Sequence, residues 1–342
     1  MYETRRNTYI DELKKIQICK VDFESPICDA SLNSTEKELL DKYYDENSIH
    51  TKRSLIILGT TLVVTNQTSR IFIQNYFIDS ILIFQKYTNI KFVIFTDNEI
   101  IIDEFQVNEY NVPILKSIIN TLEFNYESWF YGYVNGDILL SLNIQDVMLK
   151  IMESMYKKEL KQEVIIVSTR SNVQDTFFYN KTFIDDYEYN ALLNEAYKNS
   201  TYYLPNAIDL FISTKYTLTN HLFDDAVIGR YFIDNYIMDN ANFRSEYVDV
   251  IDITPSMLTI HMSGNEQYKS VQIESDLKYN QKYFATDKKG YFCDIHLANY
   301  MMQKTNNAYV IISSNDESYM LKMKDEYKLL TCYYKYLIND KC

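Results

Sequence analysis

Asn135-Gly136-Asp137 places two oxygen-bearing side chains on either side of a glycine, directly after the apolar run 131–134. Carboxylate and amide oxygens suit a hard divalent cation such as Mg²⁺ or Mn²⁺, which takes few protein ligands and completes its shell with phosphates and water. An Asn-Gly pair between apolar runs is also the strongest short signal for a β-hairpin turn. The segment therefore has two interpretations, a metal-binding strand end and a tight turn.

Two of the seven arginines stand at positions where they could bind phosphate. Arg170 ends the apolar run 163–169, and Arg230 follows Gly229. A guanidinium can bind a phosphate group through two parallel hydrogen bonds, which makes both residues candidates for that role. An ordinary ion pair is the alternative for each of them.

Strands and helices alternate over the segment that would position these residues. Continuous apolar runs predict buried strands, and apolar residues at helical spacing predict helices, one of them opening with Pro113. Four strands are expected at 55–64, 90–97, 129–137 and 163–170, and three helices at 70–87, 113–124 and 144–160. This alternation is typical of an α/β domain with a mainly parallel sheet. Ligands bind such sheets at the carboxyl ends of the strands, which here are Thr65 to Arg70, Asp97, Asn135 to Asp137 and Arg170.

The remainder of the chain is less regular. Residues 171–206 resemble an acidic, tyrosine-rich insertion, after which strands are expected at 207–214, 248–253 and 257–261 with a helix at 231–241. Helices near 293–305 and 325–338 are expected around a strand at 308–312. The predicted organisation is a helical N-terminal extension over 1–50, a main domain over 51–265 and a C-terminal α/β extension over 266–342, packed on the same domain.

The composition excludes several classes of protein. With 46% hydrophobic residues in 342, the chain has material for a large core, and six glycines contain neither a P-loop nor a dinucleotide-binding fingerprint. A net charge of −13 opposes nucleic-acid binding. Five cysteines without a C-x-x-C pair indicate no zinc module.

No apolar stretch has the length of a signal peptide core or a membrane-spanning helix. The chain as written is therefore expected in the cytoplasm. A Golgi or secretory lumen is the alternative if the sequence is a fragment.

Seven segments, in order, resemble the signature blocks of a eukaryotic family of GT-A-fold glycosyltransferase-like proteins, within the nucleotide-diphospho-sugar transferase superfamily. The resemblance covers about residues 55–265. The segments are TTLVVTNQTSR, FVIFTDN, YGYVNGDILLS, IIVSTRSNV, AIDLFIS, AVIGRYFIDNYIM and VIDITPSMLTIH. The resemblance implies a GT-A-like, Rossmann-type sheet flanked by helices, with a smaller β subsheet on the acceptor side.

The resemblance also implies a donor and a metal. A D-x-D-type motif, here Asn135-Gly136-Asp137, would hold Mn²⁺ or Mg²⁺ on the diphosphate of a nucleoside-diphosphate sugar, with UDP as the expected carrier. Asp137 and His261 would be the metal ligands, and the family has alanine where this chain has Gly136. That glycine is expected to let the backbone pass close to the diphosphate. The other donor-binding residues would be Thr65, Asp97, Asn135, Gly136, Arg170 and Arg230.

Two acidic residues are the expected catalytic pair. Asp234 matches the acid of the family's W-D-N block, with Ile233 replacing the tryptophan, and would deprotonate a hydroxyl acceptor on a glycan, protein or lipid. A first-turn residue of a helix is the alternative for Asp234. Asp209 matches the acid of a D-Y-F block and would bind acceptor or sugar hydroxyls. A non-catalytic binding or scaffold protein with the same fold is the leading alternative, and a sugar-nucleotide pyrophosphorylase would need a glycine-rich loop that this chain lacks.

Overall fold

The computed structural model describes residues 53–62, 67–96, 112–202, 207–221, 225–230, 233–264, 279–280, 295–305 and 308–314. The predicted extension over 1–50 and the predicted helix at 325–338 lie outside the described residues. The region that the sequence singled out for chemistry is described almost completely.

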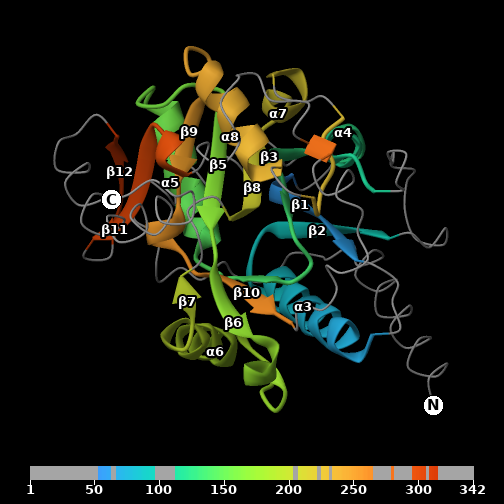
Figure 1. The fold of residues 1–342 in the computed structure, drawn as a ribbon. Helices are drawn as coiled ribbons and strands as arrows, with labels where there is room; N and C mark the ends of the chain where they lie inside the picture. The colour runs from blue at the N-terminus through green and yellow to red at the C-terminus, as the bar shows by residue number, and fades with distance from the viewer. Residues whose placement is uncertain are drawn as a thin grey trace, which may run out of the picture.

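An eight-stranded mixed sheet forms the centre of the molecule (Figure 1). Its order is β12-β11-β9-β5-β8-β3-β1-β2. Most neighbours are parallel, but β8 is antiparallel to both β3 and β5, and β12 is antiparallel to β11. The strands are β1 (Ser54–Leu62), β2 (Ile90–Thr96), β3 (Ser128–Val134), β5 (Val164–Thr169), β8 (Ile208–Thr214), β9 (Asp249–Asp252), β11 (Tyr300–Thr305) and β12 (Ala308–Ser313).

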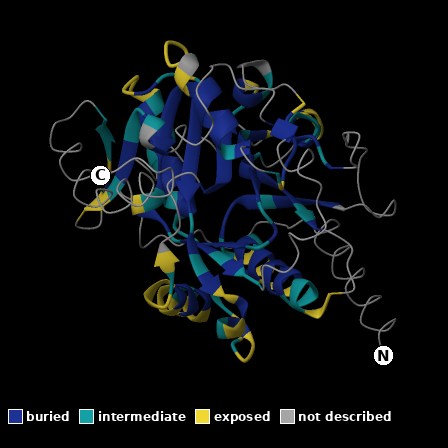
Figure 2. Ribbon diagram, viewed as in Figure 1, coloured by how far each residue is buried: buried dark blue, intermediate teal, exposed yellow. Residues whose placement is uncertain are grey.

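Helices cover both faces of this sheet because its strands are apolar on both sides. Along β1, Ile56 and Leu58 belong to one core and Ile57 to the other, as the alternation of side chains in a strand requires. The first core contains α3 (Thr68–Tyr87) and α5 (Ile144–Tyr156). The second contains α4 (Leu115–Asn125), α7 (Thr217–His221) and α8 (Ile233–Phe243). Figure 2 shows the buried residues concentrated in the central strands.

A second, four-stranded sheet lies beyond one edge of the main sheet, in the order β4-β10-β6-β7. Its strands are β4 (Ile138–Leu140), β6 (Ser171–Gln174), β7 (Thr201–Tyr202) and β10 (Thr259–Ser263), and α6 (Asp186–Lys198) packs against it (Figure 1). Short 3₁₀ turns occur at Asp175–Phe178, Thr254–Ser256 and Ile295–Leu297. The predicted α/β class, with a helix-flanked sheet and a smaller second sheet, is confirmed.

Several predictions about individual elements need correction. The helix expected near 293–305 is wrong, because residues 300–305 form β11, which pairs with β9 and β12. The supposed insertion 171–206 contains regular structure, namely β6, α6 and β7. Pro113 precedes α4 instead of opening it, because Ile114 is the N-cap residue and bridges to Val227.

The Asn135-Gly136-Asp137 segment does not connect a hairpin. The N–H of Ile138 donates to the Asn135 carbonyl at 3.1 Å, so the segment forms a β-turn. The strands on its two sides belong to different sheets, since β3 lies in the main sheet and β4 pairs with β10. The turn therefore carries the chain from one sheet to the other, and the hairpin interpretation is excluded.

Gly132 in β3 tests the close packing at the centre of the sheet. A Cβ at this position would collide with the carbonyl oxygen of Phe211 on the neighbouring β8. Backbone cannot move aside as a side chain can, so Gly132→Ala should lower the free energy of unfolding by about 1–3 kcal/mol or more in urea titrations. Gly264→Ala is the control, because there the nearest atom is the flexible Ile73 Cδ1 at 3.3 Å. Equal losses in the two variants would contradict this account.

Candidate functional site

The reversed direction of β8 creates the candidate site. Its first residues pair with the last residues of its neighbours, Leu210 with Val134 and Ile208 with Thr169. The amino end of β8 therefore lies at the same edge of the sheet as the carboxyl ends of β3 and β5. A parallel β8 would have placed Asp209 at the opposite edge.

Asp209 joins the ends of three strands. Its Oδ1 accepts from Asn135 Nδ2 at 2.5 Å, and its Oδ2 accepts from Arg170 Nη1 at 2.7 Å. The Asp209 side chain is 7% exposed and that of Arg170 18% exposed, so this ion pair is largely removed from water. Both carboxylate oxygens are thus engaged within the protein, and Asp209 fixes the directions of Asn135 and Arg170.

Asp137 lies between a guanidinium and an imidazole. Its Oδ2 accepts from Arg70 Nη1 at 3.1 Å and is 3.6 Å from His261 Nε2. Its Oδ1 is buried and has no hydrogen-bond partner among the residues that the structure describes. On the other side of the ring, His261 Nδ1 is 3.0 Å from Asn172 Oδ1, in β6.

Asp234 stands in the first turn of α8, where the positive end of the helix dipole favours an acid. Its Oδ2 accepts from the backbone N–H of Ile208 at 3.1 Å, so it lies beside the residue that precedes Asp209. We call the residues assembled here the Asp137 cluster. They are Arg70, Asn135, Asp137, Arg170, Asn172, Asp209, Asp234 and His261.

The pKa values of Asp137 and Asp234 are shifted in opposite directions. Burial alone would raise the pKa of Asp137, but His261 and the nearby arginines hold that pKa well below its usual range. Burial and the neighbouring Asp209 carboxylate instead raise the pKa of Asp234 to about 8. At neutral pH the cluster therefore holds an ionised Asp137 near Arg70 and Arg170, and a mostly protonated Asp234. Neighbouring acidic groups whose pKa values are shifted in opposite directions are typical of sites that transfer protons.

Of the predicted site residues Thr65, Asp97 and Arg230, the structure describes only Arg230. Thr65 and Asp97 lie outside the described residues, so their predicted roles stay predictions. Arg230 is partly buried, and its Nη1 donates to the carbonyl oxygen of Gly229 at 3.1 Å, in the turn before α8. Its role as a phosphate ligand also stays a prediction.

Close packing around residue 136 explains why a glycine stands there, which the sequence did not indicate. A Cβ there would lie 2.6 Å from Leu62 Cδ2 and 2.8 Å from the carbonyl oxygen of Thr61. The glycine is therefore required by packing against the end of β1. A bulky side chain at 136 would therefore disturb the fold itself, independently of any diphosphate nearby.

Two residues of the cluster were not predicted as site residues. Arg70 lies in the first turn of α3, and Asn172 lies in the short strand β6. Arg70 belongs to a stretch that follows a predicted strand, which was its only signal in the sequence. Asn172 carried none, because its contact with His261 depends on the pairing of β6 with β10.

The residues present fit a divalent cation. His261 Nδ1 is held by Asn172 Oδ1, so Nε2 points toward the Asp137 carboxylate at 3.6 Å, and a neutral imidazole in this orientation would present Nε2 as a ligand to a cation between the two side chains. The unpartnered Asp137 Oδ1 adds a further oxygen. Within the described ranges, no group of three or more His, Cys, Asp or Glu side chains is arranged to hold a metal. An ion here would therefore have two protein ligands, as Mg²⁺ often does when it is bound through phosphates.

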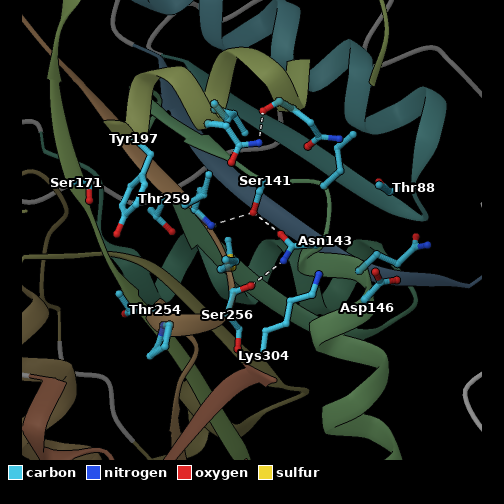
Figure 3. A pocket seen from close by; sticks show the side chains of 18 of the residues that line it. Thr88, Ser141, Asn143, Asp146, Ser171, Tyr197, Thr254, Ser256, Thr259 and Lys304 are labelled. Carbon is cyan, nitrogen blue, oxygen red and sulfur yellow. Dashed lines mark hydrogen bonds between the residues drawn. The ribbon is translucent and has the colours of Figure 1, made fainter. Parts of the chain in front are cut away.

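A cavity of about 940 Å³ opens next to the second sheet (Figure 3). It is lined from β6, α6, the start of α5, the segment between β9 and β10, and β11. None of the residues of the Asp137 cluster lines it. The cavity and the cluster are therefore separate features.

Comparison with known proteins adds no assignment: no family model and no curated protein matches this chain. No helix in the described part of the chain has the length and apolar character to cross a membrane.

The raised pKa of Asp234 predicts how stability depends on pH. Between about pH 4 and pH 8 the folded protein keeps a proton that the unfolded chain loses, so stability falls as the pH rises. Asp234→Asn removes this dependence and keeps an oxygen that can accept from Ile208. In urea titrations from pH 5 to pH 8, the free energy of unfolding of the variant, relative to that of the wild type, should rise by at most about 1.4 kcal/mol per pH unit.

The matched control is Asp185→Asn, which preserves the side-chain acceptor that caps α6. Its stability should follow the wild-type curve over the same range. A constant difference between Asp234→Asn and the wild type at every pH would show that Asp234 does not titrate in this window.

Proposed function

We propose that the protein is a glycosyltransferase that moves a sugar from a nucleoside-diphosphate donor to a hydroxyl acceptor, with a divalent metal ion. The observation that carries the proposal is the arrangement at Asp137. A buried, ionised carboxylate with one unpartnered oxygen faces Nε2 of a histidine that Asn172 orients, beside two arginines. Such a group suits a metal-bound diphosphate. The ordered resemblance of seven segments to the GT-A family supports the same function.

The donor's diphosphate would lie at the carboxyl ends of β1, β3 and β5. Asp137 and His261 would hold a Mn²⁺ or Mg²⁺ ion, and the ion would act as a Lewis acid on the leaving diphosphate. Arg70 and Arg170 would bind phosphate oxygens directly. Arg170 is already oriented by Asp209, so little ordering entropy would be lost when phosphate binds.

The reaction joins the acceptor hydroxyl oxygen to the anomeric carbon of the sugar and breaks the bond from that carbon to the diphosphate. The hydroxyl proton would pass to a carboxylate oxygen of Asp234. A pKa of about 8 makes this residue a stronger base than an ordinary aspartate, although only a minority of molecules have it ionised at neutral pH. Asp209 would act as a positioning residue, because both of its oxygens bind protein groups.

Asp137→Asn should abolish the response to donor and metal. The substitution removes the charge that a cation needs but keeps the size of the side chain. We expect at least a hundredfold lower turnover in donor-hydrolysis and transfer assays, a loss on the order of 3 kcal/mol in transition-state stabilisation. The Mn²⁺-dependent thermal shift with UDP should also disappear. Asp185→Asn, at the start of α6, should leave both measurements unchanged, and full turnover in Asp137→Asn would exclude the proposed role.

The proton acceptor can be identified from the pH profile. The value of kcat/KM should rise with pH through an apparent pKa of about 8, set by Asp234 in the free enzyme. Asp234→Asn should lower kcat/KM by about 10²–10⁴-fold and remove this limb. A slow variant that keeps the same limb would assign the titration to another group.

A non-catalytic binding protein is the second candidate, and one observation favours it. Arg70 already pairs with the oxygen that a metal would use, and the described residues offer no third acidic, histidine or cysteine ligand. Such a protein would bind a nucleoside diphosphate through its arginines without metal. UDP or GDP would then raise the melting temperature equally with Mn²⁺ and with EDTA, and no donor would be hydrolysed.

A further inference from the structure

The cavity beside the second sheet shares no lining residue with the Asp137 cluster. Ser171 lines the cavity, and the next residue, Asn172, contacts His261. Successive side chains of β6 point to opposite faces, but on β10 the cavity-lining Thr259 lies on the same face as His261, so both features adjoin the second sheet. A ligand in the cavity would therefore contact none of the residues of the Asp137 cluster.

Hydroxyl and amide groups dominate the lining of the cavity, and its charges are few. The polar but uncharged residues are Thr88, Ser141, Asn143, Gln145, Thr169, Ser171, Asn190, Asn194, Thr254, Ser256 and Thr259. Only Asp146, Asp186 and Lys304 bear charge, and no arginine is present. This scarcity of cationic side chains disfavours phosphate ligands. The remaining lining residues are apolar or aromatic, namely Tyr87, Leu142, Leu193, Tyr197, Pro255, Met257 and Leu258.

Hydrogen bonds fix the inner wall of the cavity in advance. Ser141 Oγ donates to Asn143 Oδ1, and Asn143 Nδ2 donates to the carbonyl oxygen of Ser256 at 2.7 Å (Figure 3). Ser171, whose side chain is largely buried, also lines the cavity. The wall therefore presents polar groups whose directions are partly fixed before a ligand binds.

One face of α6 forms the outer wall. Asn190, Asn194 and Tyr197 follow at intervals of four and three residues, so they lie on one side of the helix, and all three line the cavity. The Tyr197 side chain is 52% exposed. An exposed aromatic ring beside planar amides offers a flat apolar surface together with donors and acceptors, and these groups match the faces and hydroxyls of sugar rings.

We propose that this cavity is a binding site for a neutral oligosaccharide, distinct from the site at Asp137. Its volume is near the upper end of the range for pockets that enclose drug-sized ligands, about 300–1,000 Å³, which leaves room for more than one sugar ring. The ring of Tyr197 packs against one sugar face, and the hydroxyl of Ser171 and the amides of α6 bind the sugar hydroxyls. The proposal goes beyond the glycosyltransferase function and does not depend on it.

The test measures binding of four neutral probes, cellotetraose, maltotetraose, chitotetraose and mannotetraose, to the full chain by saturation-transfer-difference NMR and calorimetry. At least one should bind the wild type. Tyr197→Ala should weaken that binding at least about tenfold and Ser171→Ala several-fold. The matched control is Tyr187→Ala, which changes another exposed tyrosine of α6 that does not line the cavity, and it should bind like the wild type.

Asp137→Asn separates this site from the proposed active site. It should keep oligosaccharide affinity even though it loses the response to UDP and Mn²⁺. The proposal is overturned if none of the four probes binds at about 10 mM. It is also overturned if binding survives in both Tyr197→Ala and Ser171→Ala, or if Asp137→Asn abolishes it while the variant remains folded by circular dichroism.

Discussion

The insertion of one antiparallel strand, β8, between β3 and β5 is the constraint on which the candidate site depends. It brings Asp209 to the edge where Asn135 and Arg170 stand, and these three side chains then satisfy one another. The backbone N–H of Ile208, at the start of the same strand, is bound by Asp234. The proposed proton acceptor and the proposed phosphate ligand are thus positioned from the same two residues of β8.

A second consequence follows from the charges that this strand end collects. Asp209 remains beside Arg170, and its negative charge, added to the effect of burial, raises the pKa of Asp234. Asp137, a short distance along the edge, has cationic neighbours and stays ionised. Two aspartates at one sheet edge therefore differ in protonation. Asp137 lies beside cations and is ionised, whereas Asp234 lies beside another carboxylate and keeps its proton.

The sequence predicted most elements of the main sheet, because fully buried strands such as Leu55–Leu58 and Val164–Val167 are continuous apolar runs. The direction of β8 could not be predicted in this way, since a strand buried on both faces has the same composition in either direction. The strand β11 was mistaken for a helix because its methionines, Gln303 and Lys304 favour helices, whereas pairing with β9 and β12 decides the outcome. Arg70 was missed as a site residue for a similar reason, because only the tertiary structure shows that it reaches Asp137.

The alternation along β6 also limits how this protein can evolve. Arg170, immediately before β6, and Asn172 within it belong to the Asp137 cluster, whereas Ser171 between them lines the cavity. Deleting or inserting a single residue in this strand would exchange its two faces, so both sites would be lost in one event. Substitutions can still adjust either site alone. The length of β6 should therefore be far more constant among descendants of this chain than the identities of the residues within it.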